Sequence, residues 1–182
     1  MSDKNKAIDK AQAIKLAVFD IDGVMTDGSL MYTNNLEEFK IFHAHDGLGL
    51  QMLKKSGCEI AIVSSRSSDI VLKRMNELNI DIVLQGQSNK RETLLTIINK
   101  LNLNRSNVAY AGDDILDIPA MGVCGLSIAV ANAHPFVKKH ADWVTDNSGG
   151  AGAVREICEL ILSSQGKLES IINSYIFNLS DK

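Results

Sequence analysis

Two carboxylates follow a short apolar segment near the start of the chain, in the sequence AVFDIDG (17–23). The apolar run stops at Asp20, and Asp22 lies two residues further on, so both side chains point to the same side of an extended chain. A carboxylate can attack phosphorus to form an aspartyl-phosphate, and a second can protonate the leaving oxygen and later deprotonate water. Gly23 permits a sharp turn beside them. The pair is a candidate for phosphoryl transfer, with one acid as nucleophile and the other as general acid and base.

Three further segments end in side chains that suit the same chemistry. The segment IVSSR (62–66) supplies Ser64, QGQSNK (85–90) supplies Lys90, and GDDILD (112–117) supplies three more acids. A hydroxyl and an ammonium can hold phosphoryl oxygens while negative charge spreads over them. Several carboxylates at one point repel each other and need a cation, and hard oxygen ligands favour Mg²⁺. Each residue alone could be an ordinary strand-end or capping residue, but their order at four successive ends favours one shared site.

The elements that must bring these residues together alternate along the chain. Short apolar runs predict strands at 15–21, 58–64, 80–86, 107–113, 125–130 and 142–145. Helical spacing between them predicts helices, including one that Asp46 caps and that ends near Gly57, and one that begins at Pro135. This alternation is typical of a doubly wound α/β domain, in which ligands bind beyond the carboxyl ends of the parallel strands.

One segment breaks the alternation. Residues 29–43, SLMYTNNLEEFKIFH, predict a β-hairpin that projects just after the acidic pair. Its apolar residues have little to cover on one small domain, which suggests a contact between copies of the chain. We expect an N-terminal extension over 1–14, the main domain over 15–165, and an amphipathic C-terminal tail over 166–182. That tail is expected to be a packed helix, a mobile tail or an arm onto a neighbour.

Composition and charge exclude several classes of function. The 182 residues carry a formal net charge of -3, which argues against a nucleic-acid surface. No apolar run approaches the roughly 20 residues of a membrane span, and the polar N-terminus does not resemble a signal peptide, so we expect a cytoplasmic protein. The three cysteines show no CxxC spacing, which favours free thiols over a zinc site or a disulfide framework.

With these motifs in order, the sequence resembles the haloacid dehalogenase superfamily, whose four motifs match FDIDG, IVSSR, NK after a strand and GDDILD. The resemblance extends over residues 15–167. Within the superfamily, DGVMTDG, FHAHDGLG and GGAGAVREICELILSSQGK are similar to the phosphatases of 3-deoxy-D-manno-octulosonate 8-phosphate. The resemblance implies a Rossmann-like α/β fold with a projecting hairpin and no separate cap domain. It also implies a homotetramer and a phosphorylated sugar acid as substrate, in lipopolysaccharide biosynthesis.

The resemblance also implies a role for each site residue. Asp20 would be the nucleophile and Asp22 the acid and base, while Ser64 and Lys90 would hold the phosphoryl group. Mg²⁺ would bind the Asp20 carboxylate, the Asp22 backbone carbonyl and Asp113. Supporting positions are Gly23, Asp114 and Asp117. Contacts to substrate or to a neighbouring subunit are implied at His43, Ala44, His45, Asp46, Gly47, Arg66 and Arg74, besides Asp22 and Lys90.

Two positions lack a positive charge that the family often has. His45 stands where arginine often precedes Asp-Gly, and Ala151 stands where a basic residue often follows two glycines. Arginine is the better bidentate partner for a carboxylate. A nine-carbon sialic-acid-type 9-phosphate, or another sugar phosphate, therefore stays open as the substrate.

Two other classes of protein agree less well with the order of the motifs in this sequence. A phospho-accepting receiver domain has its acidic pair after the first strand and its acceptor after the third. Here the DxD pair ends the first strand, and GDD comes after Ser64 and Lys90. A catalytically silent binding subunit is disfavoured because every catalytic position is filled.

Overall fold

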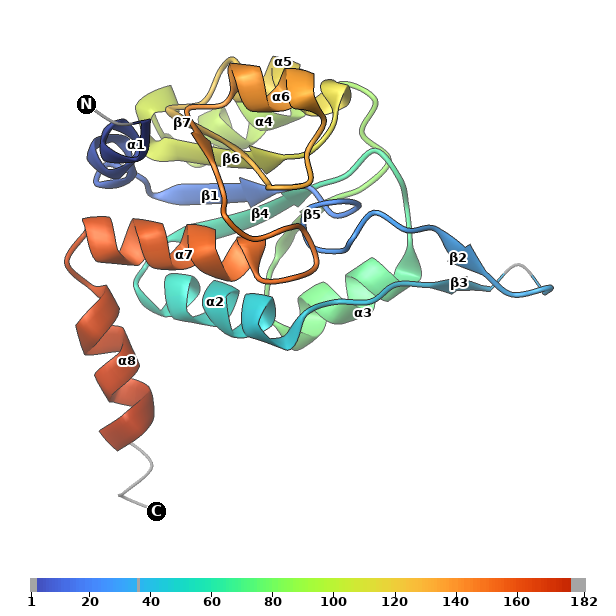
Figure 1. Ribbon diagram of the computed structural model, residues 1–182, viewed down its shortest axis with the longest axis horizontal. Helices are drawn as coiled ribbons and strands as arrows, with labels where there is room; N and C mark the ends of the chain where they lie inside the picture. Colours follow the sequence, from blue (N-terminus) through green and yellow to red (C-terminus); the bar gives the residue numbers. More distant parts are fainter. Residues whose placement is uncertain (1–2, 36, 178–182) are drawn as a thin grey trace.

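A computed structural model describes residues 3–35 and 37–177, and the centre of this described part is one six-stranded parallel sheet (Figure 1). Its strands are β1 (Leu16–Phe19), β4 (Glu59–Val63), β5 (Ile82–Leu84), β6 (Val108–Gly112), β7 (Leu126–Ala129) and β8 (Trp143–Val144). They lie in the order β5-β4-β1-β6-β7-β8, and every neighbouring pair is parallel. The chain builds outward from β1 on one side and then on the other, so the order reverses beside β1. Such a reversal is where open α/β sheets bind ligands.

Helices cover both faces of this sheet (Figure 1). On the lower face in that view are α2 (Ala44–Lys55), α3 (Asp69–Glu77) and α7 (Ala153–Ser164). On the upper face are α4 (Lys90–Lys100), α5 (Ile118–Met121) and α6 (Pro135–His140). Helix α1 (Asp3–Ala11) packs against α7, and the 3₁₀ turns are η1 (Arg105–Asn107) and η2 (Ile115–Asp117). The predicted doubly wound α/β class is confirmed, because helices on both faces bury the apolar strands.

The six strands and the helix start at Pro135 are where the sequence predicts them, but the start of α2 is not. Helix α2 begins at Ala44 with His43 at its N-cap, so the prediction that Asp46 caps it is wrong. Asp46 lies in the first turn and is buried, and its Oδ1 accepts a hydrogen bond from the backbone N–H of Arg155 at 2.8 Å. The carboxylate therefore connects α2 to α7, and the N-cap position is occupied by His43.

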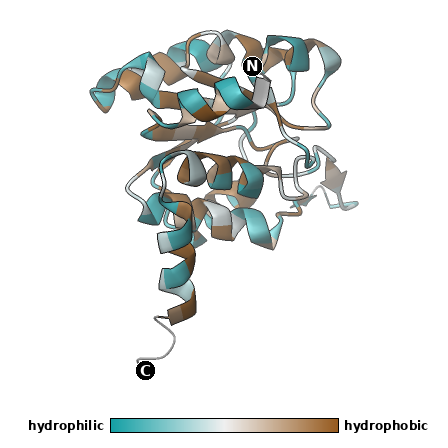
Figure 2. Ribbon diagram, turned by 60° about the vertical axis from the view of Figure 1, so that its left-hand side comes forward, coloured by the Kyte–Doolittle hydropathy of each residue, from teal (hydrophilic) through white to brown (hydrophobic). Residues whose placement is uncertain are grey.

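Two segments extend from this body (Figure 1). The predicted hairpin is confirmed: β2 (Met31–Tyr32) pairs antiparallel with β3 (Glu38–Phe39) and projects from the sheet edge. Helix α8 (Leu168–Phe177) leaves the opposite end, and the rest of the predicted tail, 178–182, lies outside the described residues. Figure 2 shows hydrophobic residues on α8 and on the hairpin. Among the described residues, these segments expose the apolar side chains of Leu30, Met31, Tyr32, Phe39, Ile41, Tyr175, Ile176 and Phe177.

The three cysteines are free thiols, as the sequence predicts. Cys58 and Cys158 are buried, and Cys124 is half-buried. Burial raises the pKa of both Cys58 and Cys124 to about 12, so these sulfurs stay protonated and unreactive at neutral pH.

Candidate active site

Side chains from four strand ends line one cavity at the carboxyl edge of the sheet, with a volume of about 290 Å³. Four of them follow β1, three follow β4, one begins α4 and four follow β6. The lining residues are Asp20, Asp22, Gly28, Leu30, Ser64, Ser65, Arg66, Lys90, Asp113, Asp114, Leu116 and Asp117. The carboxyl ends of neighbouring parallel strands meet at one edge, which is why motifs as far apart as residues 20 and 117 converge here.

Asp117 organises the floor of the cavity. Its Oδ1 accepts hydrogen bonds from Lys90 Nζ at 2.7 Å and from the Tyr110 hydroxyl at 2.9 Å. Its Oδ2 accepts from the backbone N–H groups of Asp113 and Asp114, at 3.1 and 3.2 Å. A buried carboxylate is stable only when hydrogen bonds replace its hydration, and four donors do so here. Asp117 therefore fixes both the ammonium and the loop that carries the other two acids.

The second partner of Lys90 is the candidate nucleophile. Asp20 is buried, and its Oδ2 lies 2.9 Å from Lys90 Nζ. Burial, together with the charge of Asp117, raises the pKa of Asp20 to about 6, although the Lys90 ammonium acts in the opposite direction. Burial disfavours the Lys90 cation too, but the charges of Asp20 and Asp117 raise its pKa overall. The ammonium is therefore charged at neutral pH and lies where phosphoryl oxygens next to Asp20 would need a donor.

A divalent cation fits the carboxylates of this cavity. Single oxygens of Asp20, Asp113 and Asp117 lie within 4.8 Å of one another. Asp113 Oδ1 is buried and has no hydrogen-bond partner within the described chain. Burial and the charges of Asp117 and Asp20 raise the pKa of Asp113 to about 7. A half-buried acid whose buried oxygen lacks a donor, and which sits among other acids, is stabilised as a carboxylate by a hard cation such as Mg²⁺.

Gly23 makes the space that Asp113 occupies. It has φ of +94°, and a Cβ built on it would lie 2.1 Å from Asp113 Oδ2. Gly112 plays the same part for Asp117, because a Cβ there would lie 2.4 Å from the Cβ of that residue. The two glycines thus allow backbone and carboxylates to approach more closely than any larger residue permits.

We expect Gly23→Ala to weaken the cation site. The added methyl must displace the Asp113 carboxylate, so the Mg²⁺ concentration for half-maximal phosphate release should rise by about 10- to 100-fold. Gly57→Ala is the matched control, because Gly57 has φ of +88° but a Cβ there meets nothing within 4 Å. An unchanged Mg²⁺ requirement in Gly23→Ala, measured by metal titration, would contradict this role.

Asp22 and Ser64 also line the cavity. Asp22 is half-buried, forms an ion pair with Lys40, and its Oδ2 lies 3.5 Å from Arg66 Nε. Ser64 is buried, and its backbone N–H donates to the Leu84 carbonyl at 3.0 Å, which fixes the strand end. Its hydroxyl accepts from the backbone N–H of Arg66 at 3.3 Å and keeps its own proton for a ligand. The cavity therefore offers a carboxylate, a hydroxyl and an ammonium around one point.

The structure does not bring every predicted residue into this cavity. The segment 43–47 and Arg74 are absent from its lining within the described chain. They meet each other instead, because a Cβ on Gly47 would lie 2.4 Å from Arg74 Nη2. The rings of His43 and His45 pack edge to face with centroids 4.9 Å apart. Ala151 is exposed on the loop whose glycines pack against the turn after Gly23.

The structure also reveals contributors that the sequence analysis missed. Tyr110 donates to Asp117, and Gly112 makes room for that residue. From the hairpin, Lys40 pairs with Asp22 and Glu38 with Arg66, two residues that line the cavity. Tyr110 is the one residue in the apolar run 108–111 whose side chain carries a polar group. This exception in the sequence could have indicated its role. The pairing of Lys40 with Asp22 has no such signal, because it depends on how the hairpin folds back.

Fold and site together define a class: a doubly wound α/β hydrolase with a carboxylate, ammonium and hydroxyl set suited to phosphoryl transfer. A family model for haloacid dehalogenase-like hydrolases matches residues 79–157. The 3-deoxy-D-manno-octulosonate 8-phosphate phosphatase KdsC of Escherichia coli K12 is 46% identical over 162 residues, covering 89% of this chain and 86% of its own. The chain belongs to the haloacid dehalogenase superfamily, among the relatives of KdsC.

Solved structures agree with this family. The crystal structure of the 3-deoxy-D-manno-octulosonate 8-phosphate phosphatase from Moraxella catarrhalis, in complex with magnesium ion, phosphate ion and KDO, has a TM-score of 0.92 and 41% identity. The match covers 94% of this chain and 98% of that one. The enzyme of the same name from Yersinia pestis has a TM-score of 0.89 and 42% identity, over 91% and 89% of the two chains.

Proposed function

We propose that this chain is a Mg²⁺-dependent phosphatase that hydrolyses 3-deoxy-D-manno-octulosonate 8-phosphate to the free sugar acid and phosphate, in lipopolysaccharide biosynthesis. The observation that carries the proposal is the convergence in one cavity of Asp20, Lys90 and Asp113, whose Oδ1 has no hydrogen-bond partner within the described chain. Similarity to KdsC over nearly the whole chain supports the choice of substrate. The same relatives support Mg²⁺ as the cation, because one of them was solved with it.

In the first step, a carboxylate oxygen of Asp20 attacks the phosphorus of the ester. The bond from phosphorus to the sugar oxygen breaks, and Asp22 gives its proton to that oxygen. Lys90 and the Ser64 hydroxyl hold the phosphoryl oxygens as charge spreads over them. The product of this step is a phosphate group on Asp20 and a free sugar acid.

In the second step, a water molecule attacks the phosphorus of this aspartyl-phosphate. Asp22, now a carboxylate, takes one proton from the water, and the bond between phosphorus and Asp20 breaks to release inorganic phosphate. Mg²⁺, held by the carboxylates of Asp20 and Asp113 and by the Asp22 carbonyl, supplies charge neutralisation that lets a dianionic ester approach an acidic cavity. Asp114 and Asp117 support this site, Asp117 through its four donors.

The substrate can be tested by phosphate release from a panel of esters. It contains 3-deoxy-D-manno-octulosonate 8-phosphate, the nine-carbon sialic-acid-type 9-phosphates and an aryl phosphate, each with and without Mg²⁺. The proposal expects Mg²⁺-dependent turnover with the highest kcat/KM on the eight-carbon ester. A higher kcat/KM on a nine-carbon ester would leave the proposed mechanism unchanged but would show that the substrate is the nine-carbon ester. This alternative is open because neither His45 nor Ala151 carries a fixed positive charge.

We propose further that copies of this chain assemble as a homotetramer around the projecting hairpins. The exposed Met31, Tyr32, Phe39 and Ile41 support this, since such apolar clusters mark interaction sites. The segment 43–47 and Arg74 also support it, because they hold three buried polar atoms without a partner in the described chain: His43 Nδ1, Asp46 Oδ2 and Arg74 Nε. In the assembly, we assign these residues to the substrate or to a neighbouring subunit, and Arg66 to the substrate at the cavity rim.

Light scattering at micromolar concentration tests the assembly. We expect a tetramer for the wild-type chain and smaller species for the double variant Met31→Lys, Phe39→Lys. These two residues face each other across the hairpin and are about half exposed, so two added charges there should disfavour burial between subunits. A monomeric wild-type chain would contradict the tetramer.

We also propose that the enzyme acts in the cytoplasm, which the three free cysteines support. Over the described part of the chain, no helix combines the length and the apolar character needed to cross a membrane.

A further inference from the structure

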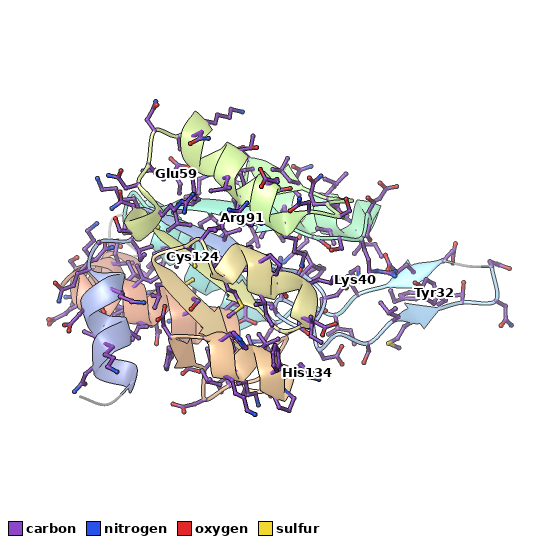
Figure 3. The ribbon with its side chains drawn as sticks, turned by 90° about the horizontal axis from the view of Figure 1, so that it is seen from above. Tyr32, Lys40, Glu59, Arg91, Cys124 and His134 are labelled. Carbon is purple, nitrogen blue, oxygen red and sulfur yellow. The ribbon has the colours of Figure 1, made fainter. Side chains whose placement is uncertain are left out.

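The base of the hairpin carries a lysine whose ammonium is buried beside the candidate acid and base. Lys40 follows β3, and its side chain is 2% exposed. Its Nζ forms an ion pair with Asp22 Oδ1 and lies 3.3 Å from Glu38 Oε1. Figure 3 shows Lys40 where the hairpin meets the body, with Tyr32 further along the hairpin. A cation that has lost its hydration in this way is stable only in a specific arrangement of partners.

Arg66 completes the arrangement from the other side. Its Nε lies 3.5 Å from Asp22 Oδ2, and its Nη2 lies 3.0 Å from Glu38 Oε1. The same Nη2 donates to the Tyr32 hydroxyl at 2.7 Å. Two cations and two carboxylates thus alternate, and their formal charges cancel. The two Asp22 oxygens face different cations, so rotation of the carboxylate would break at least one of these contacts.

Lys40 is placed to act on the reaction through Asp22, the cavity residue with which it forms an ion pair. It is absent from the lining of the cavity within the described chain, whereas Asp22 and Arg66 are part of that lining. Its ammonium contacts Asp22 and Glu38 instead. We therefore treat Asp22 as the link between Lys40 and the cavity.

We infer that Lys40 is a positioning residue: its ammonium fixes the Asp22 carboxyl group at the cavity wall, where that group meets the leaving oxygen of the ester. The inference rests on the proposed phosphatase function and adds a residue to it. In the absence of Lys40, Asp22 keeps one cation, Arg66, which is also the proposed substrate contact. Misplacement of a catalytic group by about 1 Å can cost roughly 100-fold in rate.

A comparison of esters with different leaving groups distinguishes this positioning role from a merely structural one. The ratio kcat/KM reports the steps up to the transfer of the phosphoryl group to Asp20. An aryl-oxide leaving group is stable as an anion, whereas a sugar alkoxide needs the proton from Asp22. For Lys40→Met we therefore expect kcat/KM to fall by roughly 100-fold on the best sugar phosphate, and by less than about 5-fold on p-nitrophenyl phosphate.

A double-mutant cycle with Asp22→Asn provides the second readout. If Lys40 acts through Asp22, then Lys40→Met should cause no further loss of kcat/KM in the Asp22→Asn background. Lys40→Arg keeps the cation and should recover most of the activity on the sugar phosphate. Lys54→Met is the matched control, because Lys54 pairs with Asp81 on the surface, outside the cavity lining.

Folding and metal binding are checked in the same samples by thermal melting and by Mg²⁺ titration calorimetry. Should Lys40→Met not fold, the pair Lys40→Met, Glu38→Gln, which removes one charge of each sign, takes its place in the same comparison. Equal losses on both esters, additive losses in the cycle, or no loss at all would overturn the inference. A wild-type chain that releases no phosphate from any ester would instead overturn the proposed function, and the inference with it.

Discussion

Replacing the candidate nucleophile should abolish turnover. In Asp20→Asn we expect kcat to fall by roughly 10⁴-fold or more, the scale seen when a covalent nucleophile is removed. The amide is nearly the same size as the carboxylate, and Lys90 keeps its ion pair with Asp117 at 2.7 Å. The fold and the cavity should therefore survive while the attacking oxygen is lost. Phosphate release with the eight-carbon ester at saturating Mg²⁺ is the measurement.

The matched control for this variant is Asp81→Asn. It makes the same chemical change at a side chain that is 88% exposed and paired with Lys54 on the surface. The control should retain the wild-type kcat. If Asp20→Asn kept more than about a hundredth of the wild-type rate, with its mass confirming the amide, Asp20 would not be the nucleophile.

Replacing Asp113 should have two opposite effects, one on activity and one on stability. Asp113→Asn removes a proposed ligand, so the Mg²⁺ concentration for half-maximal activity should rise at least about 100-fold. In the metal-free protein, the same change removes a carboxylate that is half-buried among other acids. We therefore expect the metal-free variant to melt about 2–4 °C above the metal-free wild type at pH 8, which corresponds to roughly 1 kcal/mol.

The pH dependence of this stabilisation follows from the raised pKa. Asp113 has a pKa of about 7 in the folded metal-free chain, against an ordinary value of 3.8. Between about pH 4 and pH 7 the folded chain keeps a proton that the unfolded chain has lost, so its free energy of unfolding declines as the pH rises through that window. Asp113→Asn has no carboxyl group at this position, so its free energy of unfolding lacks this contribution to the decline. The two melting temperatures should converge near pH 4 and differ most above pH 7.

Melting curves in EDTA across this pH range test the stability effect, and metal titrations of phosphate release test the activity effect. A metal-free Asp113→Asn that melts below wild type at pH 8 would show that the carboxylate is stabilised by the protein itself rather than by a cation. An unchanged Mg²⁺ requirement would remove Asp113 from the ligand set.

The fold and the catalytic cavity are largely predictable from the sequence, for a physical reason. Buried parallel strands need apolar residues on both faces, so runs such as the one before Asp20 are visible in the sequence. Once the strands are parallel, their carboxyl ends meet at one edge, and the residues that follow them must converge. The sequence alone therefore predicts that Asp20, Ser64 and Lys90 share one site.

Contacts between distant segments could not be predicted in the same way. Asp46 bonds to the backbone of Arg155, which is 109 residues away, and this partner rather than local capping chemistry decides its place. Lys40 and Asp22 are 18 residues apart and meet because the hairpin returns to the body. Neither pair follows a helical or strand period, so no local pattern indicates it.

The most direct test of the mechanism is to trap the phosphate on the enzyme. Borohydride reduces an acyl phosphate but leaves carboxylates intact, so a reaction quenched with it should carry homoserine in place of one aspartate. Tandem mass spectrometry of the wild-type chain, mixed with Mg²⁺ and the eight-carbon ester, should locate this change at residue 20, and Asp20→Asn should show none. Homoserine at another acid, or its absence while phosphate is released at the full rate, would contradict the covalent role of Asp20.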